Sequence, residues 1–120
     1  MDRSKEKSVL HLLARLGMTS VSYGYITEAK NIVDVLDCYN EYDEMKCCIT
    51  ALCFMYQKNF EEALLYMEPK ADKYQSLICY IILSANSLNL ASKVDHWLKK
   101  AESSDYSYVK SFGEAFKEHA

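Results

Sequence analysis

Three histidines and five cysteines are the side chains of this chain best suited to bind a metal or to act as a base or nucleophile. Zinc needs four converging ligands, and cysteine ligands usually come in C-x-x-C pairs. The sequence has no such pair, and its histidines show no ligand spacing relative to the cysteines. We therefore expect the cysteines to be small apolar core residues in a reducing compartment, and we predict no metal and no cofactor. The residues are His11, His96, His119, Cys38, Cys47, Cys48, Cys53 and Cys79.

Catalysis would require a base, a nucleophile or a metal to converge in one pocket. His11 and His96 are the internal candidates for a base, and neither lies beside a carboxylate and a nucleophile in the sequence. The paired charges Glu61-Glu62 and Lys99-Lys100 fit solvated helix faces. These patterns predict a protein that is not an enzyme.

Half of the 120 residues are hydrophobic, and the chain has only three glycines and one proline. This balance favours helices joined by short connections, because strands and hairpins need more turn residues. The length fits a single domain, 1–120, with a modest core. We expect an all-α protein.

The charge pattern argues against nucleic acid and membrane as partners. The formal net charge is −3, whereas nucleic-acid binding normally requires a clustered basic face. No apolar run approaches the roughly 18 residues that span a bilayer. The first seven residues are charged with both signs and lack the pattern of a signal peptide, so we expect a cytosolic protein.

Residues of matching size recur about 34 positions apart, the period of the tetratricopeptide helix-turn-helix unit. Small residues recur where the two helices of such a unit come closest, at Ala29 and Ala63 and at Gly17 and Ala51. The alternative is a chance coincidence in a generic helical bundle, and several independent pairs at one spacing favour repeats. Leu13/Cys47, Ile26/Phe60 and Val33/Met67 are further pairs.

A third repeat is degenerate or shifted. Its first helix keeps the pattern over 81–88, but the same register places the bulky Trp97 where a small residue belongs. Pro69 closes the second hairpin early, because proline lacks an amide hydrogen. The expected helices cover about 8–21, 27–38, 44–57, 60–68 and 72–87, then one that ends near 101 and a capping helix through 116. The capping helix has one narrow apolar face, formed by Val109, Phe112 and Phe116.

In a stack of such hairpins the first helix of each unit lines a concave face. A groove that clamps a terminal carboxylate needs basic and amide donors, and apolar residues occupy that region here. An apolar, methionine-rich groove suits the apolar face of a partner helix instead. The predicted partner-binding residues are Ala14, Met18, Met45, Cys48, Leu52, Met55, Cys79 and Ile82.

The first helix is apolar over a wider arc than one packed face requires. An end helix should present a polar face to water, so we expect a second partner on its outer side. The alternative is self-association of the chain through the same surface. The candidate residues for this second surface are Val9, Leu12 and Leu16.

The chain resembles the small tetratricopeptide-like chaperones of bacterial type III secretion needle subunits, the YscG/PscG type. The resemblance covers about Leu10 to Phe116 and rests on length, order and sparse residues. Its carriers are Leu12-Leu13-Ala14, Glu28-Ala29-x-x-Ile32 with Leu36, Leu52-x-x-Met55, Phe60-x-x-Ala63-Leu64, Leu88-x-Leu90 and Trp97-Leu98-Lys99-Lys100-Ala101.

The resemblance implies a concrete function in the bacterial cytoplasm. Members of this family hold the C-terminal amphipathic helix of the needle subunit in their groove, together with a small helical-hairpin co-chaperone near the N-terminal helices. This would keep the needle subunit monomeric until export. The groove residues would contact the needle helix, and the outer residues of the first helix would contact the co-chaperone. Two alternatives stay open, a translocator chaperone and a tetratricopeptide-like adaptor without an export role.

Overall fold

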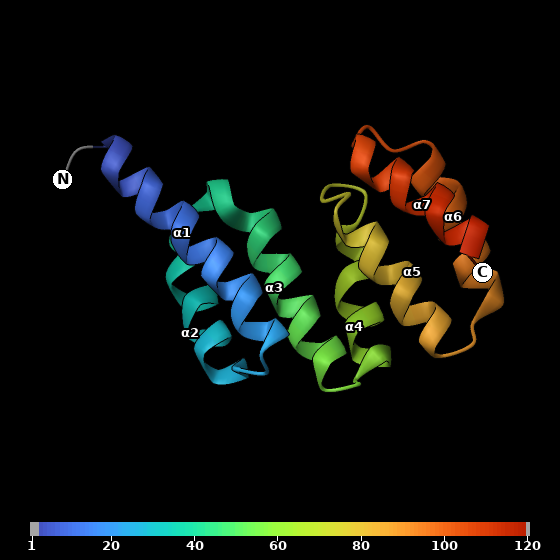
Figure 1. Cartoon of the computed structure of the whole chain (residues 1–120), viewed down its shortest axis with the longest axis horizontal. Coiled ribbons are helices and arrows are strands. Elements are labelled where there is room, and N and C mark those ends of the chain that lie inside the picture. Colours follow the sequence, from blue (N-terminus) through green and yellow to red (C-terminus); the bar gives the residue numbers. More distant parts are fainter. Residues whose placement is uncertain (1–2, 120) are drawn as a thin grey trace. The chain divides into compact units, whose positions relative to one another are not determined.

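The computed structural model describes residues 3–119, with side chains from residue 7 onward (Figure 1). Helices and their connections account for all of the described residues, which confirms the predicted all-α fold. None of these helices is both long and apolar enough to cross a membrane. The elements are α1 (Arg3–Ser22), α2 (Ile26–Leu36), η1 (Asn40–Tyr42), α3 (Asp43–Tyr56), α4 (Phe60–Met67), η2 (Glu68–Lys70), α5 (Leu77–Ser87), α6 (Ala91–Glu102) and α7 (Ser107–His119).

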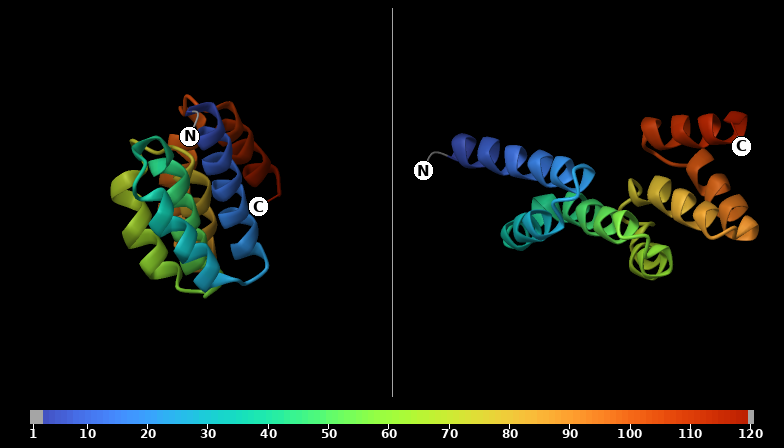
Figure 2. Two further views of the ribbon diagram at one scale, coloured as in Figure 1. Left: turned by 90° about the vertical axis from the view of Figure 1, so that its left-hand side faces the viewer. Right: turned by 60° about the horizontal axis from the view of Figure 1, so that its bottom comes forward.

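The chain divides into two compact units, each with its own set of packed helices. Unit 1 spans Met1–Gln57 and unit 2 spans Lys58–Ala120. In unit 1, α1 packs against both α2 and α3, which also pack against each other. In unit 2, α5 packs against α4 and α6, and α7 packs against α6 and α5 (Figure 2). Within each unit the packing follows the order of the chain, as expected of helical repeats.

The core of unit 1 forms where α1, α2 and α3 converge. Gly17 of α1 lies at this point, and a Cβ built on it would stand 2.7 Å from Ile49 Cδ1 and 3.1 Å from Ile32 Cγ2. Ile49 is fully buried, as is Ala29 of α2 in the same core cluster. Only a residue without a side chain lets the helices approach this closely, which explains the small residue predicted at position 17.

A buried tyrosine and an ion pair join the elements of unit 1 at its polar edges. The hydroxyl of Tyr42 donates to the backbone oxygen of Lys7, and it lies 3.3 Å from His11 Nδ1. Lys46 of α3 donates to the Asp37 carboxylate after α2, at 2.6 Å. This hydrogen bond raises the pKa of the Lys46 ammonium, because Asp37 favours its charged form.

The hairpin turns reveal how the third repeat is shifted. Gly24 and Lys58, which lie 34 residues apart, both have positive φ, and Asn89 follows only 31 residues after Lys58. At Gly24 and at Asn89, the left-handed residue and the residue after it each donate a backbone hydrogen bond to the last turn of the preceding helix. This pair of bonds is a common helix C-cap. The third turn therefore comes three residues early relative to a strict 34-residue period.

The helix after each turn shows the same shift. The amide hydrogens of Ala29, Ala63 and Val94 each donate to the backbone oxygen of the residue that precedes the helix, four positions earlier. Val94, which is buried, is thus the counterpart of the two alanines. A strict 34-residue period would put Trp97 at the position of the two alanines. In the structure Trp97 lies three residues beyond Val94 along α6.

Unit 2 ends with α7 packed on α6, as the predicted capping helix. Val109 is fully buried, and a Cβ on Gly113 would stand 3.1 Å from Ala101 Cβ. Gln75 Oε1 accepts hydrogen bonds from the Ser104 hydroxyl and, at 3.0 Å, from the Asp105 amide. The Ser104 hydroxyl in turn accepts a hydrogen bond from the backbone amide of Tyr106, the residue that precedes α7.

Two helix starts differ from the prediction by about five residues. The first helix begins at Arg3, about five residues earlier than expected, because charged residues can continue a helix whose apolar face starts later. The fifth helix begins at Leu77 instead of near Asp72. Pro69 lies within the 3₁₀ turn η2, and further turns follow it, where Asp72 pairs with Lys100 at 3.0 Å.

Candidate functional site

The outer face of α1 carries a stripe of exposed large apolar residues, Val9, Leu12 and Leu16, called here the α1 stripe. Their exposed fractions are 49%, 63% and 54%. At 100° per residue the three side chains fall within an arc of about 60°. Three contiguous exposed aliphatic residues on one helix are a feature of protein-binding surfaces, since soluble proteins usually scatter such residues.

The opposite face of the same helix belongs to the core. Leu10, Ala14, Gly17 and Val21 recur at core spacing and are buried against the rest of unit 1. The α1 stripe is therefore not needed to attach the helix to its own unit. Its apolar character remains to be explained by contact with another molecule.

A shallow hollow of about 490 Å³ lies beside the α1 stripe. It is lined by one stripe residue, Leu12, and by the polar side chains Lys7, Ser8, His11 and Arg15. In the described part of the chain neither Lys7 nor Arg15 forms an ion pair. The stripe thus has a basic edge with unneutralised charge.

The eight residues predicted to line the groove are divided between the units. Cys79 and Ile82 belong to unit 2, and the others belong to unit 1. Three of the eight, Ala14, Cys48 and Ile82, are buried in the chain, so a partner cannot reach their side chains in this arrangement. The remaining five are half-buried, namely Met18, Met45, Leu52, Met55 and Cys79.

In unit 1 the half-buried residues form a partly open apolar layer. Met18, Met45 and Leu52 pack against the hydrophobic core of the unit and keep part of their surface accessible. Each presents unbranched or γ-branched side-chain atoms that can adapt to a partner helix. Contact of these residues with a partner stays a prediction.

Sequence reasoning missed Leu83, which is 38% exposed on α5. Counted back from the turn residues, Leu52 lies six positions before Lys58, and the residue six positions before Asn89 is Leu83. The 34-residue period instead pairs Leu52 with Asn86, and it selects Ile82, which is fully buried, as the counterpart of Cys48. The early turn at Asn89 is the signal that would have corrected this choice.

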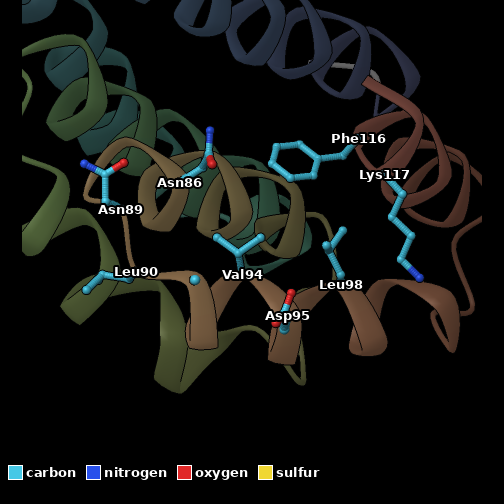
Figure 3. A pocket seen from close by; sticks show the side chains of 9 residues that line it. Asn86, Asn89, Leu90, Val94, Asp95, Leu98, Phe116 and Lys117 are labelled. Atoms are coloured by element: carbon cyan, nitrogen blue, oxygen red, sulfur yellow. The ribbon is translucent and has the colours of Figure 1, made fainter. Parts of the chain in front are cut away.

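A second hollow, of about 550 Å³, lies within unit 2 (Figure 3). The side chains of Val94 and Leu98 from α6 and the ring of Phe116 from α7 point toward it. Lys117 at its rim pairs with Glu102. Phe116 was predicted to close the stack, and it lines this hollow while remaining half-buried. The other lining residues are Asn86, Asn89, Leu90, Ala91 and Asp95.

The cysteines are mostly core residues, as predicted. Cys47, Cys48 and Cys53 are buried and Cys79 is half-buried, whereas Cys38 is exposed. Burial raises the pKa of the Cys53 thiol, and it raises that of Cys79 to about 11. Both thiols are therefore protonated at neutral pH and act as small apolar groups. Among the described residues no three potential metal ligands cluster together.

Comparison with known proteins adds no family to these observations. Neither the protein-family models nor the curated proteins contain a match to this chain. Its function must therefore be inferred from its own surfaces.

Proposed function

We propose that this protein is a type III secretion chaperone of the bacterial cytoplasm. It binds the C-terminal amphipathic helix of the needle subunit on its half-buried apolar residues, and it binds a small helical co-chaperone on the α1 stripe. The needle helix, which would otherwise polymerise, is buried against the chaperone until export. The family resemblance suggests these partners, and the surface chemistry is compatible with them.

One observation carries the proposal, the exposure of Val9, Leu12 and Leu16 on a helix whose other face already fills a core. Full burial of such a side chain is worth about 1.5–3 kcal/mol, and these three, which are about half exposed, can gain about half of that from a contact. A binding protein gains this free energy from its partner. A monomer that kept the stripe bare would be prone to aggregate.

The needle helix is assigned to the other apolar layer, around Met18, Met45 and Leu52 with Met55 at the end of α3. These side chains are half-buried, so a partner helix can complete their burial without unfolding the unit. In unit 2, considered by itself, Leu83 is the exposed leucine of α5 at the repeat position that corresponds to Leu52. The layer contains no lysine or arginine, which suits an apolar helix better than an acidic peptide terminus.

The test is co-expression of the chain with a needle subunit and a candidate co-chaperone, followed by size-exclusion chromatography with mass determination. The proposal predicts a complex that contains one copy of each protein. Leu52→Asp with Met55→Asp should release the needle subunit and retain the co-chaperone. Leu12→Asp with Leu16→Asp should do the reverse.

Val35→Asp is the matched control, because Val35 is an exposed apolar residue of the same unit on α2. It should leave both partners bound. If no variant alters the complex, or if no complex forms with a needle subunit, the chaperone proposal is wrong. A stable complex with an unrelated protein would favour the adaptor alternative.

A further inference from the structure

The charge around the α1 stripe differs from that of the rest of the chain. Acidic residues outnumber lysine and arginine overall, 17 to 14. Between residues 7 and 27, however, the sequence has no aspartate or glutamate. This stretch includes the whole stripe and both described basic side chains of the hollow beside it.

Arg15 and His11 lie on one side of the stripe, and Lys7 lies further round α1 on that side. At 100° per residue, Arg15 is displaced by about 60° from Leu12, and His11 lies beyond it on the same side. Lys7, about 140° from Leu12 around the helix, lines the same hollow as Leu12 and Arg15. His11 also faces the Tyr42 hydroxyl at 3.3 Å, which holds its ring at this edge. The edge is exposed, and its lysine and arginine have no ion-pair partner among the described residues.

An amphipathic helix is the occupant that fits a stripe with the spacing i, i+3, i+7. Its own apolar stripe would cover Val9, Leu12 and Leu16. The residues that flank this stripe would then lie beside Arg15 and Lys7. Acidic side chains at that flank would gain attraction and steer association, whereas basic ones would be repelled.

A second copy of this chain does not satisfy the same requirement. Pairing of two α1 stripes would bring two stretches together that contain lysine, arginine and histidine but no acid. The basic edges would repel each other or remain unpaired. The charge pattern therefore favours a different protein over self-association.

We propose that the α1 stripe binds an amphipathic helix that carries aspartate or glutamate along the edge facing Arg15 and Lys7. This inference rests on the proposed function, in which the stripe receives a helical partner, and it adds the chemistry by which that partner is recognised. The apolar stripe provides most of the affinity. The basic edge selects the partner and sets the orientation of its helix.

Two designed peptide probes test the inference with the full-length protein. Both are about 18 residues long, enough to form a helix, and share one leucine stripe with the spacing i, i+3, i+7. One carries glutamates along a single flank of the stripe and the other carries lysines there. Fluorescence anisotropy should show about tenfold tighter binding of the glutamate peptide, since two or three exposed charge pairs contribute this much.

Salt and charge reversal provide the internal controls. The difference between the peptides should shrink in about 0.5 M NaCl, where the Debye length is roughly 4 Å. Lys7→Glu with Arg15→Glu should reverse the preference without a loss of helix content. Leu12→Asp should abolish binding of both peptides.

The outcomes separate this inference from the proposed function. Equal affinities that both disappear in Leu12→Asp would overturn the charge preference while supporting a helical partner on the stripe. Binding that survives Leu12→Asp, or no binding of either peptide, would overturn the assignment of the stripe itself. A dimer of the chain alone that dissociates in Leu12→Asp would also overturn the inference, because the occupant would then be a second copy.

Discussion

Gly17 and Ile49 are in such close contact that a single methyl group added to the glycine would stand 2.7 Å from Ile49 Cδ1. The contact joins α1 to α3 at the centre of unit 1. It sets how closely α1 packs against α3 and therefore which face of α1 remains exposed. The α1 stripe depends on this packing, since a helix rotated about its axis would bury different residues.

This contact should appear as a coupling free energy between the substitutions Gly17→Ala and Ile49→Val. Alanine gains about 1 kcal/mol of helix propensity over glycine, but its methyl collides with the isoleucine. Removal of Cδ1 relieves the collision at the cost of a small cavity. We expect Ile49→Val to cost about 1 kcal/mol in the wild type and clearly less in the Gly17→Ala background.

Chemical denaturation of the four proteins in this double-mutant cycle measures the coupling. Gly17→Leu should be severely destabilised, because no shift of Ile49 alone makes room for it. Ser22→Ala, an exposed change in the same helix, is the control. A coupling free energy near zero would show that the helices can separate freely at this point.

Lys58→Gly should stabilise the protein by about 0.5–1 kcal/mol. Lys58 has φ of 62°, a conformation that costs a residue with a side chain but not glycine. The same change at its neighbour Gln57, whose φ is −81°, should destabilise. Thermal unfolding of both variants tests the turn geometry, and equal effects at the two positions would contradict it.

Leu83→Asp and Ile82→Asp should have opposite consequences although the residues are adjacent. Leu83 is 38% exposed and Ile82 is fully buried. Aspartate at position 82 places an unpaired charge in the core of unit 2 and should unfold it. Aspartate at position 83 should leave the helix content unchanged and, on the proposed function, weaken binding of the partner helix.

Circular dichroism and a binding assay on the same two samples distinguish these effects. Leu65→Asp, a change at an exposed leucine on α4 of the same unit, is the control for added surface charge. If the Ile82 variant folded normally and only the Leu83 variant unfolded, the three-residue shift of the third repeat would be wrong.

The Cys79 thiol should make stability depend on alkaline pH. Its pKa rises from 9.0 to about 11 in the folded chain because of burial. The unfolded chain thus loses this proton first as the pH rises. The stabilisation is complete below pH 9 and is lost as the pH rises toward 11.

Urea denaturation between pH 8 and pH 11 measures this loss, and Cys79→Ala should flatten that part of the profile. Cys38→Ala is the control, since Cys38 is exposed. Alkylation at pH 8 followed by peptide mass spectrometry offers a second measurement. Cys38 should react well before Cys79, and the opposite order would contradict the burial.

Much of the fold could be predicted from the sequence because the repeat spacing follows from the way the helices pack. Small residues at Gly17, Ala29 and Ala63 recur because close helix crossings permit nothing larger, and all three are buried. The third repeat was harder to predict. Its turn at Asn89 depends on a local backbone conformation, and the three-residue change in spacing is invisible to a fixed period.

The candidate surface was predictable only in part. Val9, Leu12 and Leu16 were assigned to a partner because α1 is apolar over too wide an arc, and the structure leaves them exposed. The burial of Ala14 and Cys48 could not be foreseen, because the sequence does not show which flank of a helix its neighbours cover. The identity of the partners stays a prediction.

The most direct test of the central claim is a pull-down of the tagged chain from the cells that produce it, with quantitative mass spectrometry of the bound proteins. The chaperone account predicts a needle subunit and one small helical protein, each near one copy per chain. The Leu12→Asp variant should lose the small helical protein. Recovery of a self-dimer, or of an unrelated protein without a needle subunit, would contradict the account.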